Sequence, residues 1–276
     1  MKILVPVKRV SDPDNANKVK VAADGKAVTT DGLEWKLNPF DEYAVETALR
    51  LNENAKGNEK LGETVVVTLG PKESVQQLRQ ALAMGAERGI LVEADDNKLD
   101  SVVAARALKA IVDKEKPDVV LLGKQAVDGD SNATAQILAE LLGWPQATFA
   151  MSIATTDGGK TLTVGREVDT GVLTVKVQTP AVVSVDLRIV APKAVQNGVT
   201  PATHEYGDGA RYASLKGIMQ AKKKPVAEEK LDGLGVDGTL TTTYTKFELP
   251  PARKAGVTVE SVDELIAKLK NEAKVI

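Results

Sequence analysis

The chain has 276 residues, 43% of them apolar, which is enough to form a substantial hydrophobic core in one or two domains. Its 36 basic and 38 acidic residues give a net charge of −2, too balanced for the broad basic surface of a nucleic-acid-binding protein. Cysteine is absent and His204 is the only histidine, so thiolate catalysis, disulfides, Ser-His-Asp triads and histidine zinc clusters are excluded.

The sequence contains no signal for a membrane segment. No apolar stretch approaches the ~20 residues that a membrane-spanning helix needs, so we expect no membrane insertion. The strand-like residues 2–7 begin the chain and leave no room for a signal or transit peptide. We expect the protein in the cytoplasm if its source is bacterial, and in the mitochondrial matrix if its source is eukaryotic.

The N-terminal part of the chain predicts a buried strand followed by a hairpin. Residues 2–7 form the strand, which should end near Pro6 because proline cannot donate a hydrogen bond in a ladder. Residues 19–30 carry Asp24-Gly25 at their middle, a typical two-residue turn. We expect this hairpin to lie outside the main sheet.

Helices and strands then alternate. Asn38, Pro39 and Asp41 form a helix start, with Asn38 as the cap and the acid in the first turn. Later segments follow the same alternation: strands over residues 63–69 and 88–93, helices over 75–84 and 103–112. Such alternation predicts a parallel sheet covered by helices.

The most informative stretch joins a buried strand at residues 119–123 to a helix that starts near residue 133. In open α/β sheets this junction lies at the carboxyl edge of the strands, where ligands bind. The first amides of a helix lack intrahelical partners and favour an anion, and Ser131 and Thr134 add donors. Alternatively, Asp130 or Ser131 simply caps the helix.

Two acids in the same loop, Asp128 and Asp130, could form an acid–base pair or bind magnesium. The chain has no histidine or second acidic cluster beside them in sequence, so capping or hydroxyl binding is favoured. Their charges also oppose a polyphosphate more than a single phosphate. The loop therefore predicts a nucleoside monophosphate site.

Beyond residue 146 the pattern changes to short turns between strands. Strand-like runs occupy residues 147–154, 160–167, 172–178 and 181–190. The turns are too short for helical crossovers, so we expect antiparallel pairing within the same sheet. The fold class predicted is α/β: a Rossmann-like, mostly parallel sheet flanked by helices, with an antiparallel extension and an extended C-terminal arm.

The C-terminal third shows little core signal. We expect a nucleotide-binding domain over residues 1–190, a surface loop and partner-recognition segment over 191–224, and an arm over 225–276. The segment 211–219 holds large apolar residues and is either a short helix packed on its own domain or an exposed contact segment. In the arm, Ser261 and Glu264 form a capping box before a one-sided apolar helix.

Two nucleotide motifs were tested. Residues 233–238 match the dinucleotide fingerprint, but no strand is predicted before them and no helix after them. No glycine-rich loop ends in Gly-Lys-Ser or Gly-Lys-Thr, which argues against an ATPase or kinase.

Several separated segments resemble one family, the beta (small) subunits of electron-transferring flavoproteins, over nearly the whole chain. They are residues 7–10 (Val-Lys-Arg-Val), 38–40 (Asn-Pro-Phe), 81–86 (Ala-Leu-Ala-Met-Gly-Ala), 122–126 (Leu-Gly-Lys-Gln-Ala), 128–134, 144–146 (Trp-Pro-Gln), 166–167, 180–183, 211–215 (Arg-Tyr-Ala-Ser-Leu) and 221–224. One departure is the connection over residues 189–209, which is longer than the family's.

The resemblance implies a heterodimer whose alpha (large) subunit holds the redox-active FAD, while this subunit binds AMP structurally and has no catalytic residues of its own. The AMP would be bound by Pro6, Asn38, Phe40, Leu69, Gly123, Asp128, Gly129, Asp130, Ser131, Asn132, Ala133 and Thr134. No metal is implied. The electrons would pass from flavin dehydrogenases to a respiratory acceptor.

The resemblance also implies contacts with other proteins. The segment containing Tyr212, Leu215, Ile218 and Met219 would bind dehydrogenases such as acyl-CoA dehydrogenases, with Leu215 as the anchor. Glu167 would contact an arginine of the moving flavin domain, and the C-terminal arm would wrap the alpha subunit. Two alternatives are a bifurcating relative with a second redox-active FAD in the same pocket, and a free-standing adenylate-binding module.

Overall fold

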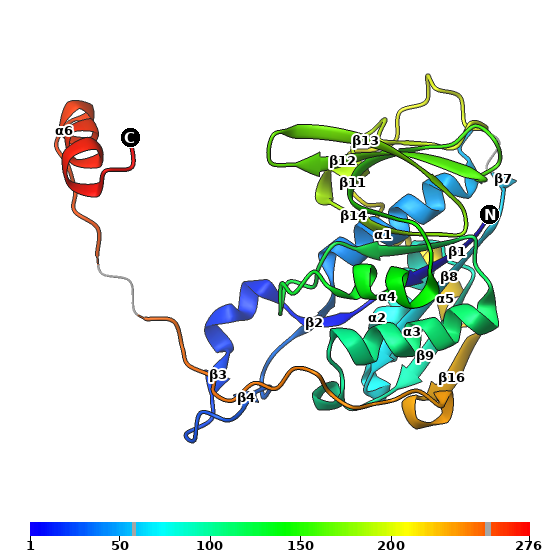
Figure 1. Ribbon diagram of the computed structural model, residues 1–276, viewed down its shortest axis with the longest axis horizontal. Helices are drawn as coiled ribbons and strands as arrows, with labels where there is room; N and C mark the ends of the chain where they lie inside the picture. The colour runs from blue at the N-terminus through cyan, green and yellow to red at the C-terminus, as the bar shows by residue number, and fades with distance from the viewer. Residues whose placement is uncertain (57–58, 252–254) are drawn as a thin grey trace. The chain divides into compact units, whose positions relative to one another are not determined.

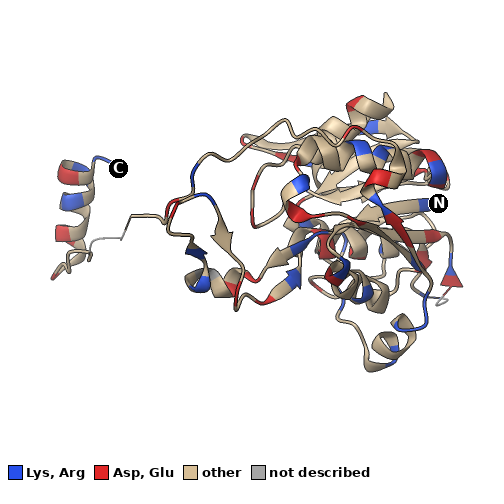
Figure 2. Cartoon of the chain, turned by 90° about the horizontal axis from the view of Figure 1, so that it is seen from below, with Lys and Arg blue, Asp and Glu red and all other residues tan. Residues whose placement is uncertain are grey.

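A computed structural model describes residues 1–56, 59–251 and 255–276 (Figure 1). It contains two compact units: residues 1–19 with 30–243 form the main unit, and residues 20–29 with 244–276 form the second. Basic and acidic residues are interspersed over the elements, as Figure 2 shows.

The main unit is built on a sheet of ten strands. They are β1 (Lys2–Pro6), β8 (Glu63–Gly70), β9 (Arg88–Glu93), β10 (Val119–Gly123), β11 (Gln146–Ala154), β12 (Thr161–Val168), β13 (Gly171–Gln178), β14 (Ala181–Val185), β15 (Val195–Gln196) and β16 (Val226–Lys230). The predicted α/β class with a mostly parallel sheet is confirmed.

The order of the strands identifies where a ligand can bind. Five parallel neighbours follow each other as β9, β8, β1, β10 and β14. The chain builds outward from β1 in one direction through β8 and β9, then returns to the other side of β1 with β10. In doubly wound sheets, ligands bind at the carboxyl ends of the strands where this order reverses. Here the reversal lies between β1 and β10.

Helices cover both faces of the sheet. They are α1 (Pro39–Leu51), α2 (Val75–Met84), α3 (Ser101–Glu115), α4 (Thr134–Leu142) and α5 (Leu215–Ala221) in the main unit. Apolar residues of α1 and α2 share a buried core with Ile3 and Val5 of β1. Residues of α3 and α4 share the opposite core with Leu4. The alternating side chains of β1 therefore point into two separate cores.

The extension of the sheet differs in part from the prediction. β11, β12 and β13 are antiparallel neighbours, as expected. The strand predicted over residues 181–190 is instead parallel to both β10 and β11, and it ends at Val185. A bulge between Ala147 and Ala150, with Phe149 at φ 56°, bends β11 next to β14. Turn length alone does not reveal such a bend.

Two strands of the main sheet, β15 and β16, were not predicted. β15 comes from the long connection after residue 191 and pairs with β11. β16 comes from the predicted arm and extends the sheet beside β9, so the main unit continues to residue 243. β16 also places a strand before the residues 233–238 that match the dinucleotide fingerprint. The 3-10 turn Leu231–Leu234 follows it, and no helix begins before α6 (Val262–Lys268) among residues 235–251 and 255–261.

Short antiparallel pairs of strands complete the fold. In the main unit β2 (Arg9–Ser11) pairs with β5 (Trp35–Leu37), and β6 (Glu53–Asn54) pairs with β7 (Glu59–Lys60). In the second unit β3 (Lys20–Val21) pairs with β4 (Val28–Thr29), which confirms the separate hairpin around Gly25.

The second unit also holds α6. Ser261 accepts a hydrogen bond from the Glu264 amide over 3.2 Å, and the Glu264 carboxylate accepts one from the Glu260 amide. The predicted cap is therefore present. The Glu264 carboxylate accepts from the amide of Glu260, whereas a standard capping box would use the amide of Ser261. In the described ranges no helix has the length and apolar character needed to cross a membrane.

Candidate functional site

The predicted nucleotide residues meet at the carboxyl ends of three neighbouring strands. Pro6 ends β1, Gly123 ends β10, and Leu69 is the second-last residue of β8. Asn38 precedes α1, and the loop of residues 124–133 leads into α4. The parallel registers of β1 with β8 and β10 place these ends along one edge. This is the edge at which the strand order reverses.

Asn38 binds the loop after β10 instead of capping its own helix. Its Nδ2 donates to the carbonyl oxygen of Gln125 over 2.9 Å, and its Oδ1 accepts from the amide of Val127 over 3.1 Å. The side chain makes no capping hydrogen bond to α1. Asn38 therefore occupies the predicted N-cap position of α1, but its side chain does not cap the helix. Because Asn38 is only 1% exposed, both hydrogen bonds are protected from water.

Lysines neutralise acids around the same loop. Nζ of Lys8 lies 2.7 Å from Oδ1 of Asp128 and 2.8 Å from Oδ2. Nζ of Lys124 lies 2.7 Å from the buried carboxylate of Asp186, and 5.1 Å from the centre of the Phe40 ring. The negative charge that Asp128 brings to the loop is therefore balanced locally. The sequence did not reveal these pairs, because Lys8 and Asp128 are 120 positions apart.

The N-terminus of α4 has no side-chain cap. The N-cap residue is Ala133, and no side-chain hydrogen bond is made to the first turn. Asp130 instead accepts from Nε2 of Gln125 over 2.6 Å, and Oγ of Ser131 lies 2.8 Å from Oγ of Ser101. The alternative in which Asp130 or Ser131 caps the helix is therefore wrong. The first amides of α4 keep their capacity to bind an anion.

The backbone of this loop adopts an unusual conformation. Asp130 and Asn132 have φ values of 48° and 47°, in the left-handed region that non-glycine residues rarely occupy. Such positions cost free energy and persist only where the surrounding structure imposes them. The contacts of Asn38, Gln125 and Ser101 supply that constraint.

Asp41 is a site residue that sequence analysis treated only as a first-turn acid. Its Oδ2 accepts the backbone N–H of Lys8 over 2.8 Å. A β-carbon on Gly123 would lie 2.5 Å from Oδ1 of Asp41 and 2.6 Å from the carbonyl carbon of Phe40. Burial raises the pKa of Asp41 to about 7, because desolvation outweighs its hydrogen bonds with Lys8, Asn38 and Gly123. Asp41 thus joins the ends of β1 and β10 to the start of α1.

The arrangement offers an anionic ligand the free first amides of α4. Its other polar groups are carboxamides, hydroxyls, carboxylates and lysines. Among the residues described, no cluster of three or more histidines and acids is placed to bind a metal ion. Sequence patterns found the strand, loop and helix, and the resemblance included Gln125 in the span from residue 123 to residue 134. Lys8 and Asp41 were missed as site residues, because their roles depend on contacts between distant segments.

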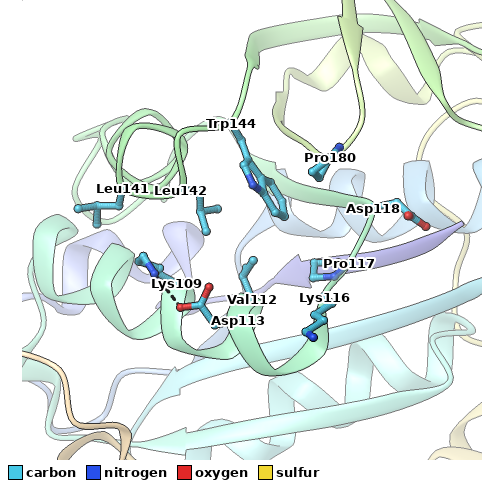
Figure 3. Close-up of a pocket in the computed structure, with 10 residues that line it drawn as sticks. All are labelled: Lys109, Val112, Asp113, Lys116, Pro117, Asp118, Leu141, Leu142, Trp144 and Pro180. Atoms are coloured by element: carbon cyan, nitrogen blue, oxygen red, sulfur yellow. Dashed lines mark hydrogen bonds and ion pairs between the residues drawn. The ribbon is translucent and has the colours of Figure 1, made fainter.

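A pocket at the other end of the sheet has different chemistry (Figure 3). Its volume is about 440 Å³, and Lys116, Pro117 and Pro180 in its wall precede β10 and β14. It therefore lies at the amino ends of these strands. Trp144 and the leucines at the end of α4 form an apolar wall, and Lys109 is paired with Asp113 over 2.7 Å. Doubly wound sheets bind ligands at the opposite edge.

An exposed apolar patch lies on and before α5. Tyr212 is 98% exposed, Leu215 76% and Met219 63%, and Ile218 is partly exposed. The helix α5 packs closely against the end of α2. A β-carbon on Gly217 would lie only 2.5 Å from the Ala83 carbonyl oxygen, so the two backbones are in contact there. The segment thus includes a short helix packed on its own domain, as one interpretation expects, and it leaves large apolar side chains in solvent. Its role as a contact segment stays a prediction.

Charged side chains fix both ends of this segment. The guanidinium of Arg211 contacts the carboxylates of Glu46 over 2.6 Å and Glu53 over 2.7 Å. At the other end, Nζ of Lys224 donates to the carbonyl oxygens of Leu82 and Ala86 over 2.8 and 2.6 Å. Lys224 therefore binds one carbonyl in the last turn of α2 and one just after the helix, instead of extending into solvent.

Glu167, the other predicted contact residue, lies near the end of β12. Its Oε1 forms an ion pair with Nη1 of Arg188, and about a third of its side chain is exposed. Glu167 is thus accessible, and its charge is engaged within the chain.

Comparisons with known proteins all give the same family. The family model described as "Electron transfer flavoprotein domain" matches residues 26–234. The chain is 46% identical over 276 residues to the electron transfer flavoprotein subunit beta of Bradyrhizobium diazoefficiens, covering 100% of both chains. It is 44% identical over 276 residues to the mitochondrial subunit beta of Arabidopsis thaliana, again covering 100% of both. It is 43% identical over 278 residues to the human subunit beta, covering 100% of this chain and 99% of the relative.

Proposed function

The chain belongs to the electron transfer flavoprotein family as a beta subunit, and from this premise we propose that it binds AMP at the carboxyl ends of β1 and β10. The observation that carries the proposal is the uncapped N-terminus of α4 at the point where the strand order reverses. A single phosphate at that helix end would find free amides and favourable charge.

The charges of the loop support a monophosphate. Asp128 is paired with Lys8, and the Asp130 carboxylate is hydrogen bonded to Gln125. Like charges repel, so the carboxylates of the loop oppose a polyphosphate more than a single phosphate. The residues present therefore fit AMP, and AMP in this position would hold together the segments that Asn38 and Asp41 already connect.

The alpha subunit would supply the redox chemistry. A beta subunit implies an alpha partner, and we propose that this partner holds the redox FAD and that α6 contacts it through Leu265 and Ile266, which are exposed in the second unit. The heterodimer would carry electrons from flavin dehydrogenases, such as acyl-CoA dehydrogenases, to a respiratory acceptor. It would do so in the bacterial cytoplasm or the mitochondrial matrix, and this chain would act as a carrier subunit without catalytic residues.

The patch of Tyr212, Leu215, Ile218 and Met219 would be the contact for the dehydrogenases. Exposed aromatic and aliphatic side chains on a fixed base are typical of binding hot spots. Glu167 would exchange its Arg188 partner for an arginine of the moving flavin domain.

Nucleotide content tests the central proposal. The chain is purified with its co-expressed alpha subunit, the nucleotides are released by heat, and they are quantified by chromatography. We expect one AMP and one FAD per heterodimer. Two FAD and no AMP would replace the proposal with the bifurcating alternative. Native mass spectrometry addresses the free-standing module, which predicts a monodisperse chain in the absence of the alpha subunit.

A further inference from the structure

The helix α5, which carries three residues of the apolar patch, is held in place by few apolar contacts. It has seven residues, whereas an isolated helix in water needs roughly 12–15 to be even marginally stable. Of these seven described residues, only Ala221 at the C-terminal end is buried, while Leu215, Ile218 and Met219 are exposed. Burial of apolar side chains therefore contributes little to the position of α5 on the main unit.

Arg79 of α2 binds the C-terminal end of α5. Its Nη1 donates to the carbonyl oxygen of Ala221, the last residue of α5, over 2.5 Å. The same nitrogen donates to the carbonyl oxygen of Lys224, in the turn that follows, over 2.7 Å. The last carbonyls of a helix have no partners within the helix, and a cation beside them is favourable. Arg79 therefore joins the end of α5 to the middle of α2.

Lys224 makes the reciprocal contact. Its Nζ donates to the carbonyl oxygens of Leu82 and Ala86, at the C-terminal end of α2. Each of the two segments thus supplies the cation that binds the terminal carbonyls of the other. Hydrogen bonds from charged donors are stronger than those between neutral groups. We call this pair of contacts, made by Arg79 and Lys224, the clamp.

The chain on either side of α5 is fixed by other contacts. Before the helix, Arg211 is paired with two carboxylates, and Oγ of Ser214 accepts the amide of Gly217 over 3.0 Å. After it, the carbonyl oxygen of Pro225 accepts the amide of Gly89 over 3.0 Å, and β16 then pairs with β9. Loss of the clamp would therefore loosen α5 without detaching the chain from the sheet.

We propose that Arg79 and Lys224 are positioning residues for the docking of a dehydrogenase, an inference that rests on the proposed function of the patch. They act through α5, because the clamp holds this helix in one orientation before the partner arrives. Docking then does not have to order the helix. If α5 were competent to bind only part of the time, the apparent dissociation constant would rise by the inverse of that fraction.

Hydrogen exchange tests the effect on α5 without any dehydrogenase. The variants Arg79→Met and Lys224→Met, each in the heterodimer with the alpha subunit, are compared with the parent by mass spectrometry. Both side chains are only partly buried, so we expect both variants to fold. The peptide covering residues 215–224 should exchange about tenfold faster in each variant, and the peptide of α3 should not change. Unchanged exchange of residues 215–224 in both variants would overturn the proposal.

Arg106→Met is the matched control. Arg106 lies on α3 and also donates to a backbone carbonyl oxygen of a distant segment, that of Asp237, over 3.0 Å. This variant should keep the parental exchange of residues 215–224 and the parental KM for the reduced dehydrogenase. An equal rise of that KM in Arg106→Met and Arg79→Met would overturn the proposal, because the effect would then be general.

Electron transfer tests the positioning role. In Arg79→Met the KM for the reduced dehydrogenase should rise about fivefold, while kcat and the FAD and nucleotide contents stay as in the parent. Arg79→Lys keeps a donor at this position and should recover part of the affinity. An unchanged KM in Arg79→Met, with a raised KM in Leu215→Ala, would overturn the proposal.

A double-mutant cycle shows whether Arg79 acts through the patch. In the variant Leu215→Ala with Met219→Ala, docking no longer depends on α5, so adding Arg79→Met should raise the KM by less than about twofold. A further fivefold rise would overturn the proposal. If Leu215→Ala itself leaves the KM unchanged, the proposed docking function of the patch fails, and the positioning role fails with it. Nucleotide content, measured on the same samples, reports on the AMP proposal independently.

Discussion

Gly123 and Asp41 approach so closely that a β-carbon at position 123 would lie 2.5 Å from Oδ1 of Asp41. No real β-carbon tolerates such a contact, and the adjacent Phe40 backbone prevents relaxation in the other direction. The end of β10 and the start of α1 are therefore fitted to each other, and this fit positions the loop that follows Gly123.

The Gly123→Ala substitution should consequently destabilise the protein. We expect a loss of about 1–3 kcal/mol in the free energy of unfolding, the usual cost of an overpacked position, together with reduced nucleotide content. Urea unfolding measures the first and chromatography the second. Gly129→Ala is the control for stability, since no atom lies within 4 Å of a β-carbon there. Equal stability of the two variants would contradict the importance of the contact.

Asn38→Ala should release the loop after β10. Two buried hydrogen bonds, to Gln125 and Val127, disappear and leave their backbone partners unpaired. We expect a loss of about 1–3 kcal/mol of stability and a marked drop in bound nucleotide. Asn97→Ala, at an exposed asparagine that bonds within its own turn, should leave nucleotide content intact. Full nucleotide content in Asn38→Ala would show that the loop does not need this side chain.

The raised pKa of Asp41, about 7 in the folded protein against 3.8 for the free group, predicts a pH-dependent stability. Between these values the folded protein retains a proton that the unfolded chain has lost. The contribution of Asp41 to the free energy of unfolding therefore falls as the pH rises from about 4 to 7, by at most about 1.4 kcal/mol per pH unit.

Asp41→Asn isolates this effect, because the amide keeps the shape and cannot ionise. The difference in unfolding free energy between parent and variant should change over pH 4 to 7 and be constant above it. Urea titrations at several pH values measure this difference. A difference that does not vary with pH would mean that Asp41 titrates at its ordinary value in the folded protein.

Leu215→Ala tests the proposed contact for dehydrogenases. Leu215 is 76% exposed, so its truncation should leave stability and flavin content unchanged. Loss of an apolar anchor should raise the KM for the reduced dehydrogenase about tenfold. Stopped-flow or steady-state electron transfer measures this. Leu141→Ala, on the exposed side of α4, provides the control, and unaltered transfer in Leu215→Ala would remove the assigned role.

The sequence by itself determined the types of the main elements and the position of the candidate site. Residues 63–69, 88–93 and 119–123 have strand-like apolar runs, and the helices that follow them have 3.6-residue periodicity, so local patterns sufficed. The loop before Thr134 was found in the same way, because a strand, a polar loop and a helix in succession define a carboxyl edge.

Only the tertiary structure decided which segments meet. The parallel insertion of β14, the addition of β15 and β16, and the pairing of Lys8 with Asp128 all join residues that are far apart in the chain. Asn38 looked like a helix cap because capping is a local pattern, but its carboxamide binds a loop 87 residues away. Arg79 and Lys224 likewise bind the terminal carbonyls of helices that come together only in the folded chain. The spacing of apolar residues in the sequence indicates which residues are buried. Which residues then contact each other depends on how the whole core packs.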